Sequence, residues 1–218
     1  MAVIPSKQEL DDALIARHGA ELHALLSQAT VAISALGGLG SNIAIALARA
    51  GVGHLHLIDF DRVDISNLNR QQYFVRQLGL FKTEALRDNL KEIAPYLQVT
   101  TSTVRVTEEN IPTLLAEPDI ICEAFDKAEA KAMLVNAVLK HFQDKWLVSG
   151  NGMAGKGSAN LIRTRRLGRH FIICGDGVSD VEASGTLFSA RVMACAAHEA
   201  LAVIQIIAGD FENVNIKE

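Results

Sequence analysis

The segment that most constrains the fold is a cluster of glycines between an apolar run and a helical pattern. Residues 30–35 (Thr-Val-Ala-Ile-Ser-Ala) form a short apolar run that is typical of a buried parallel strand. Gly37, Gly38 and Gly40 follow, and a helical pattern begins directly after them. Residues 54–59 then alternate as a second strand does. A strand, a glycine turn, a helix and a strand in this order predict a right-handed βαβ unit.

The rest of the chain continues the alternation of strands and helices. Two segments near the C-terminus, residues 158–164 and 169–174, are joined by a short polar link and fit an antiparallel pair. The sequence therefore predicts an α/β fold: a Rossmann-like, mainly parallel sheet flanked by helices, with an antiparallel C-terminal extension of the sheet. The other expected helices cover residues 6–26, 82–93, 108–116, 128–142 and 187–208, and the other expected strands cover residues 97–105, 119–123 and 145–149.

Neither a repeat nor a Pro/Gly/Ser-rich linker divides the chain, so we expect residues 1–218 to form a single domain. We divide this domain into the N-terminal helix (residues 6–26), a core (30–149) and a C-terminal part (150–209). Ser6 and Glu9 have the spacing of a capping box at the start of the first helix.

Composition and charge exclude several classes of protein. The net charge is −4, which is unlike the basic footprint of a nucleic-acid-binding protein. The sequence has no apolar stretch of 18 residues free of charge and no signal-peptide pattern, so we expect no membrane span and a cytoplasmic protein. The three cysteines and seven histidines match neither a disulfide framework nor a structural metal motif.

The glycine turn and Asp59 together suit a nucleotide. Glycines let the backbone approach a phosphate, and the amino end of a helix favours its negative charge. Asp59 ends the second strand, where a carboxylate accepts hydrogen bonds from ribose hydroxyls. A steric role for the glycines and a turn-capping role for Asp59 stay open. These residues fit an NAD-dependent oxidoreductase as well as an ATP-binding enzyme.

Three residues further along the chain favour ATP. Arg70 precedes Lys82, which begins a predicted helix. A triphosphate carries more charge than a dinucleotide and needs more cationic donors. Asp126 follows a strand that should end at the same edge of the sheet as the glycine turn, where a carboxylate can hold Mg²⁺. A solvated surface cation, for either basic residue, and a helix cap, for Asp126, are the structural alternatives.

These motifs give the chain a resemblance to the ThiF/MoeB family of adenylyltransferases, the bacterial relatives of ubiquitin-activating enzymes. The resemblance covers about residues 15–209 and is most specific in the Asp-Phe-Asp and Ser-Asn-Leu-Asn-Arg-Gln strings. The tail strings Ser-Gly-Asn-Gly-Met-Ala-Gly and Ile-Cys-Gly-Asp-Gly look most like the short ThiF branch of thiamine biosynthesis. The strings begin at Asp59, Ser66, Ser149 and Ile173.

The resemblance implies a reaction and a site. ATP would adenylylate the C-terminal glycine carboxylate of a small ubiquitin-like sulfur carrier (ThiS-like, ending in Gly-Gly) and release pyrophosphate. The core (30–149) would bind the nucleotide, and the C-terminal part (150–209) would bind the carrier. It also implies a homodimer, with Arg17 reaching into the site of the partner subunit, a Mg²⁺ ion on Asp126, and no zinc, because the paired CxxC motifs of larger relatives are missing. The residues that it assigns to ATP are Gly37, Gly38, Gly40, Asp59, Asp61, Ser66, Asn67, Asn69, Arg70, Lys82 and Asp126, with Arg70, Lys82, Asp126 and Arg17 as the catalytic group.

The chain departs from the family pattern at two positions. Ala35 replaces the usual first glycine of the turn, and Lys127 stands where the family often has asparagine after the metal-binding aspartate. Cys174 precedes a Gly-Asp-Gly loop and is a possible accessible thiol, although an ordinary free cysteine is the alternative. A tRNA-linked carboxylate and a molybdopterin-pathway carrier are the alternative substrates, and a non-catalytic scaffold is a further alternative.

Overall fold

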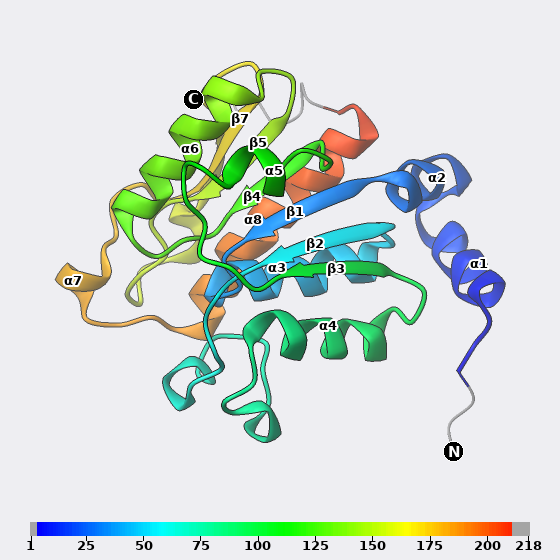
Figure 1. The fold of residues 1–218 in the computed structure, drawn as a ribbon, viewed down its shortest axis with the longest axis horizontal. Helices are drawn as coiled ribbons and strands as arrows, with labels where there is room; N and C mark the ends of the chain where they lie inside the picture. The colour runs from blue at the N-terminus through cyan, green and yellow to red at the C-terminus, as the bar shows by residue number, and fades with distance from the viewer. Residues whose placement is uncertain (1–3, 211–218) are drawn as a thin grey trace.

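The computed structural model describes residues 4–210 and contains one seven-stranded sheet with the strand order β3-β2-β1-β4-β5-β7-β6 (Figure 1). Every pairing in it is parallel except that of β6 with β7 at one edge. The predicted α/β sheet with an antiparallel extension is therefore confirmed. The strands are β1 (Thr30–Ser34), β2 (His54–Ile58), β3 (Gln98–Ser102), β4 (Ile120–Glu123), β5 (Trp146–Gly150), β6 (Arg163–Arg166) and β7 (Phe171–Gly175).

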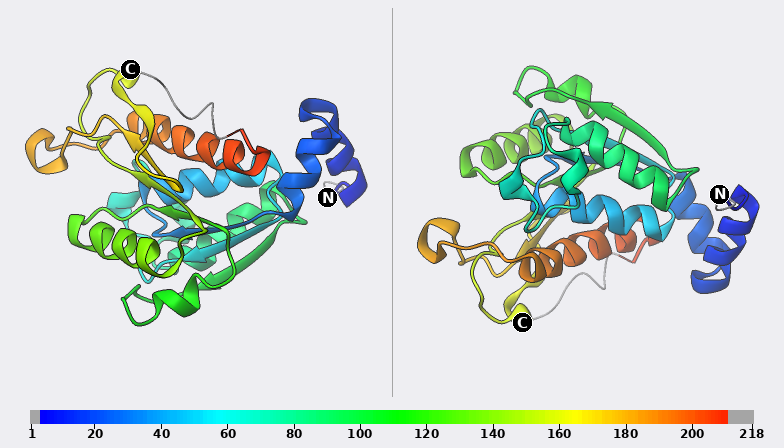
Figure 2. Two further views of the ribbon diagram at one scale, coloured as in Figure 1. Left: turned by 90° about the horizontal axis from the view of Figure 1, so that it is seen from above. Right: turned by 90° about the horizontal axis from the view of Figure 1, so that it is seen from below.

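Helices cover both faces of the sheet and bury one apolar cluster on each (Figure 2). The helices α3 and α8 lie on one face, together with α4, while α5 and α6 lie on the other. The helices are α1 (Lys7–His18), α2 (Ala20–Gln28), α3 (Gly38–Ala50), α4 (Lys82–Ile93), α5 (Ile111–Leu114), α6 (Ala128–His141), α7 (Val181–Ser184) and α8 (Ser189–Ala208), and short 3-10 turns cover Ile65–Asn67, Val75–Gln77 and Ala159–Leu161.

The C-terminal helix α8 packs against α3 and against strands β5, β6 and β7. It is long and apolar enough to cross a membrane by length and composition, with a mean hydropathy of 1.5 over its most apolar window. Half of that window is buried inside the protein, as in the core helix of an α/β domain. Packing therefore accounts for the apolar character of α8.

The predicted N-terminal helix over residues 6–26 is wrong in one respect, because the structure has two helices there. Gly19 separates α1 from α2 with a φ of 86°, a conformation that only glycine adopts without strain. The Ser6–Glu9 capping box is confirmed at the start of α1. In α1 no residue is buried, so this helix lies at the periphery (Figure 1).

Several predicted boundaries also shift; the strand expected over 97–105, for example, is Gln98–Ser102. The helix expected over residues 108–116 is only Ile111–Leu114, because Asn110 accepts a hydrogen bond from the amide of Thr107 and holds the preceding residues in a turn. The strand expected over 158–164 begins at Arg163, since Ser158 caps a 3-10 turn before it. These shifts leave the order of the elements unchanged.

Candidate functional site

The glycine turn lies at the edge of the sheet where the parallel strands end (Figure 1). A Cβ atom on Gly40 would be 1.9 Å from the carbonyl oxygen of Ala35, and one on Gly38 would be 2.9 Å from Val192. Both positions therefore require glycine, since only its small backbone fits between the strand, the turn and α8. Ala35 itself has a φ of 73°, so the missing first glycine leaves a strained alanine in the turn.

Asp59 fastens the end of β2 to this turn. Its carboxylate accepts the amide of Leu36 at 2.6 Å and the amide of Asp61 at 2.8 Å. The side chain is buried, and this burial raises the pKa of Asp59 above its usual value despite the nearby Lys82. Each carboxylate oxygen keeps a second lone pair, so the predicted hydrogen bonds to a ribose remain compatible with this structural role.

Residues 70–73 form a strap that lies along the turn. The hydroxyl of Tyr73 donates to the carbonyl of Leu36 at 2.8 Å, and the amide of Gln72 donates to Ser41 Oγ at 3.1 Å. Asn42 Nδ2 donates both to the carbonyl of Gly38 and to that of Arg70. The strap therefore fixes the backbone of Arg70 against the amino end of α3.

The two predicted phosphate-binding cations flank the turn. A Cβ atom added to Gly38 would lie 3.5 Å from Cγ of Arg70, so the stem of this side chain packs beside the turn. The guanidinium of Arg70 donates to Ser66 O and Asn69 Oδ1. The side chain of Lys82 is only 7% exposed, and its ammonium lies 3.0 Å from Asp61 Oδ2. Within residues 4–210 the buried ammonium has Asp61 as its hydrogen-bond partner, so it keeps donors for an anion. Asp61 is exposed enough for water to replace Lys82 as its partner.

Ser66 and Asn67 have local partners. Ser66 Oγ donates to Asp64, and Asn67 Oδ1 accepts the amide of the same Asp64. These bonds close the 3-10 turn that precedes the strap. Asn69 Nδ2 donates to Leu187 O at 3.1 Å, so the loop before α8 returns to the site. A cavity of about 410 Å³ lies there, lined by Asn69 and residues 185–189.

Asp126 lies just beyond β4, on the same sheet edge, and it is exposed. The alternative helix-capping role is not seen, because the cap of α6 is Lys127 and no side chain caps that helix. Within residues 4–210 no cluster of three His, Cys, Asp or Glu side chains could hold a metal. One carboxylate suits Mg²⁺, which binds through one or two carboxylates and the phosphates of its nucleotide.

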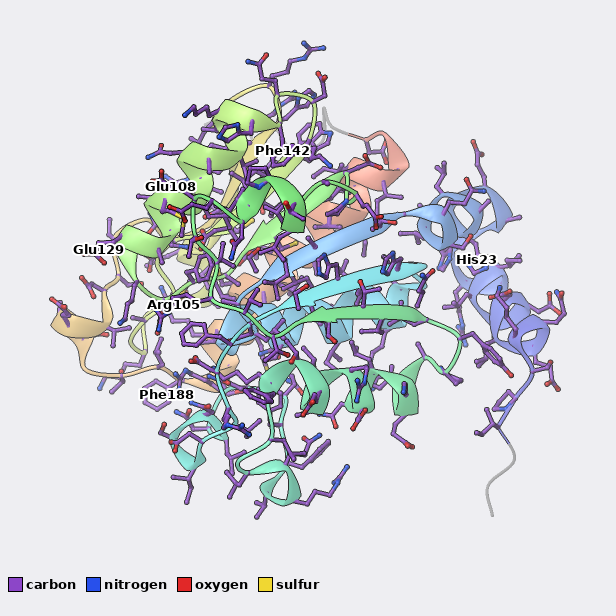
Figure 3. The ribbon with its side chains drawn as sticks, in the orientation of Figure 1. His23, Arg105, Glu108, Glu129, Phe142 and Phe188 are labelled. Atoms are coloured by element: carbon purple, nitrogen blue, oxygen red, sulfur yellow. The ribbon has the colours of Figure 1, made fainter. Side chains whose placement is uncertain are left out.

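Arg17 lies far from the glycine turn. It is exposed in the last turn of α1, at the edge of the sheet where the strands begin. Figure 3 shows the separation, with His23 on the neighbouring α2 at one end of the sheet and Arg105 and Phe188 at the other. Within one subunit, Arg17 therefore does not join the site.

The prediction of an accessible thiol at Cys174 is wrong. Cys174 is fully buried on β7, and Cys122 and Cys195 are buried as well. Burial, together with the nearby Glu199, raises the pKa of the Cys174 thiol far above its usual value. The inward face of a strand accounts for this, because alternate side chains of β7 point into the core.

Three polar residues of the site escaped prediction: Asn42, Gln71 and Tyr73. Gln71 is buried, and its Oε1 has no hydrogen-bond partner in the described part of the chain. It lies beside Gly37, where an added Cβ atom would be 3.8 Å from its Nε2. A buried unpaired acceptor beside this glycine turn is a suitable partner for the hydroxyl or amine of a ligand. Asn42 carries a sequence signal, since it is polar within an apolar helix, whereas the contact of Tyr73 with Leu36 has none.

The model of the ThiF family matches residues 11–217. The adenylyltransferase and sulfurtransferase MOCS3 of Culex quinquefasciatus is 34% identical over 137 residues, which are 62% of this chain and 31% of that protein. Ubiquitin-like modifier-activating enzyme 5 of Caenorhabditis elegans is 34% identical over 136 residues, 57% of this chain and 32% of that protein. The chain thus spans about a third of the length of these curated relatives.

Among solved structures, the tRNA N6-threonylcarbamoyladenosine dehydratase of E. coli in complex with ATP superposes with a TM-score of 0.84 at 21% identity. The match covers 97% of this chain and 99% of that chain. At this identity the likeness establishes the shared fold, and it extends over the whole sheet and its helices.

Proposed function

The chain belongs to the ThiF family, and from this premise we propose that it is an adenylyltransferase that uses ATP to activate a carboxylate. A carboxylate oxygen attacks the α-phosphorus of ATP, the bond from this phosphorus to the bridging oxygen breaks, and pyrophosphate leaves. The products are an acyl-adenylate and pyrophosphate. The nucleophile is already ionised at neutral pH, so no general base is needed, and positioning and charge stabilisation are sufficient.

The observation that carries this proposal is the pair of cations beside the glycine turn. Arg70 and Lys82 flank the amino end of α3, where backbone amides and the helix dipole favour phosphate. Charge grows on the departing pyrophosphate, and fixed guanidinium and ammonium groups stabilise it without reorganisation. A hydride transfer between dinucleotide and substrate has no comparable need for two cations at this position.

We further propose that the carboxylate is the C-terminal glycine of a small ubiquitin-like sulfur carrier, of the kind that serves thiamine biosynthesis. The names of the curated relatives support a ubiquitin-like substrate and sulfur chemistry, while the choice between a ThiS-like and a molybdopterin-pathway carrier rests on the tail strings of the sequence. Mg²⁺ on Asp126 and a homodimer with Arg17 in the partner's site are part of the proposal. The position of Arg17 excludes contact with the site of its own subunit and is compatible with contact with the site of a partner subunit.

A tRNA-linked carboxylate is the second candidate substrate. The E. coli dehydratase structure that superposes with a TM-score of 0.84 is named for a tRNA substrate. That match covers nearly the whole of both chains. The net charge of −4 favours the carrier, because binding to tRNA requires the neutralisation of several phosphates.

The test is pyrophosphate exchange into ATP, measured with recombinant ThiS-like and molybdopterin-pathway carriers that end in Gly-Gly. We expect exchange that requires the carrier and Mg²⁺ and is lost when the two terminal glycines are deleted. Exchange supported by tRNA alone would replace the carrier with the second candidate. An absence of exchange with every carrier and with tRNA, together with thermal stabilisation by NAD in place of ATP and Mg²⁺, would overturn the adenylyltransferase.

A further inference from the structure

Positive charge is concentrated in one segment of this acidic chain. Residues 156–175 contain no aspartate or glutamate, although the whole chain has a net charge of −4. The remainder of the molecule is correspondingly more acidic. The cations of this segment are Lys156, Arg163, Arg165, Arg166 and Arg169.

Four alternate residues of this segment point to solvent. Leu161, Arg163, Arg165 and Leu167 are all exposed, while the residues between them are buried or half-buried. Thr164 faces inward and bonds His198 of α8 at 2.9 Å, so Arg163 and Arg165 lie on the face of β6 away from α8. Leu161 and Leu167 flank them just before and just after the strand. We call these four residues the arginine strip. It lies on the edge strand, whose outer backbone groups have no neighbouring strand within residues 4–210.

The arginines of the strip have no internal counter-charge. Among the described residues, neither Arg163 nor Arg165 forms an ion pair, and the same is true of the nearby Arg169. Arg166 differs from them, because its guanidinium folds back onto the carbonyls of Gly168 and Arg169. Unpaired like charges repel each other and create a positive field, which a partner with negative charge would relieve.

The strip starts at the sheet edge that holds the glycine turn. Arg163 pairs with Gly175 at the carboxyl end of β7, and the loop that follows β7 returns to the site through the bond from Asn69 to Leu187. Four strand spacings separate β6 from β1, which is about 19 Å. An extended tail of about six residues spans this distance. A partner on the strip can therefore place its C-terminus at the glycine turn.

We propose that the arginine strip binds an acidic, partly apolar face of the carrier protein whose C-terminal glycine is adenylylated. This inference rests on the proposed function. Leu161 and Leu167 are 52% and 60% exposed at the two ends of the strip, and apolar contacts beside arginines suit a folded protein surface. Recognition of RNA would call for exposed aromatic stacking platforms beside the cations, whereas the neighbouring Trp146 and Phe171 are half-buried.

The test compares two charge reversals of equal size. The variant R163E/R165E reverses the strip, and the control K91E/K140E reverses two exposed lysines on α4 and α6. Steady-state exchange gives the KM for the carrier and for ATP at two salt concentrations. We expect the strip variant to raise the KM for the carrier about tenfold at low salt, with less salt dependence, while kcat and the KM for ATP stay within twofold. The control should match the wild type, and R163K/R165K should restore most of the affinity.

Direct binding separates this proposal from the proposed function. Fluorescein-labelled carriers are titrated with the protein in the absence of ATP and followed by anisotropy. If R163E/R165E binds a carrier more weakly than the wild type does, the proposed role of the strip is supported. When no exchange is seen in that case, only the proposed adenylylation is refuted. If R163E/R165E and K91E/K140E bind the carrier equally well or have the same KM for it, the proposed role of the strip is overturned. The same holds if no carrier binds. If R163E/R165E loses a salt-sensitive binding to total tRNA while its binding to the carrier is unchanged, the strip binds RNA, and the proposal is overturned.

Discussion

The amide of Leu36 donates a 2.6 Å hydrogen bond to Asp59, which joins the glycine turn to the end of β2. Asp59→Ala leaves the buried amide of Leu36 and the half-buried amide of Asp61 without their acceptor. We expect the free energy of unfolding to fall by about 3 kcal/mol and the Tm by about 6–12 °C. Thermal unfolding with and without ATP measures both the stability and the nucleotide affinity, which should fall together. Asp12→Ala, an exposed control on α1, should change the Tm by about 1 °C or less. An unchanged Tm for Asp59→Ala would refute the structural role.

Arg70→Ala should abolish the chemistry while the fold persists. Arg70 is anchored by its backbone, and its side chain makes only local bonds to Ser66 and Asn69. We expect kcat/KM for pyrophosphate exchange to fall at least about 100-fold. Arg87→Ala, which removes a half-buried arginine paired with Asp88 on α4, is the control and should retain activity. Exchange at the wild-type rate in Arg70→Ala would remove this residue from the catalytic group.

Ala35→Gly should stabilise the protein. A left-handed alanine costs about 1–2 kcal/mol, while a new glycine costs about 0.4–1 kcal/mol through the unfolded chain. We expect a net gain of about 0.5–1 kcal/mol and a rise in Tm of about 1–4 °C. Ala130→Gly, within the helix α6, is the matched control and should lower the stability by about 1 kcal/mol. A loss of stability in both variants would show that the strain at Ala35 is offset elsewhere.

Glu199 makes stability depend on pH in a direction opposite to that of most carboxylates. Burial raises its pKa well above the ordinary value, so the folded protein keeps a proton that the unfolded chain releases. This contribution is complete below the pKa of the unfolded chain and decreases as the pH rises.

Glu199→Gln removes this dependence. Urea unfolding at pH 5 and pH 7.5 should show the variant gaining on the wild type as the pH increases, by up to about 1.4 kcal/mol per pH unit. Glu129→Gln, on the exposed side of α6, should show a constant difference. A wild-type pH slope in Glu199→Gln would mean that another group holds the proton.

The three thiols should be unreactive in the native protein. Cys122, Cys174 and Cys195 are buried, and their surroundings raise the pKa of each thiol. Titration with a thiol reagent should give no rapid reaction under native conditions and three thiols per chain in denaturant. Rapid native labelling of one thiol would restore a covalent role for it. If the thiols are unreactive, the acyl group of the proposed carrier acyl-adenylate would be transferred to a nucleophile of another molecule.

The parts of the fold that follow from local patterns were predicted from the sequence. Helix α4 (Lys82–Ile93) has the predicted bounds. A helical pattern begins at Lys82, and Pro95 disfavours the helical conformation at the residue before it. The break at Gly19 was missed, since the apolar pattern continues through it and one glycine is tolerated in a helix. The antiparallel pairing of β6 was predicted, but its first residue was not, because Ser158 caps a 3-10 turn in a segment that also reads as a strand.

The sequence indicates which residues lie near the glycine turn better than it indicates how these residues contact one another. The glycines, Asp59 and Lys82 have fixed spacing from recognisable elements, so the sequence locates them. The strap bonds join residues about 30 positions apart, and no local pattern contains them. Burial of Cys174 depends on which face of β7 meets α8, and the apolar run of that strand gives no preferred face.

The loosely packed first helix gives the protein a graded stability. No residue of α1 is buried, whereas α8 lies in the core, so α1 opens with a small free energy and α8 opens only when the domain unfolds. A subunit alone would hold Arg17 on its least protected element. In the proposed homodimer, contact with a second subunit would protect that element, and the completeness of the site would then depend on protein concentration by mass action.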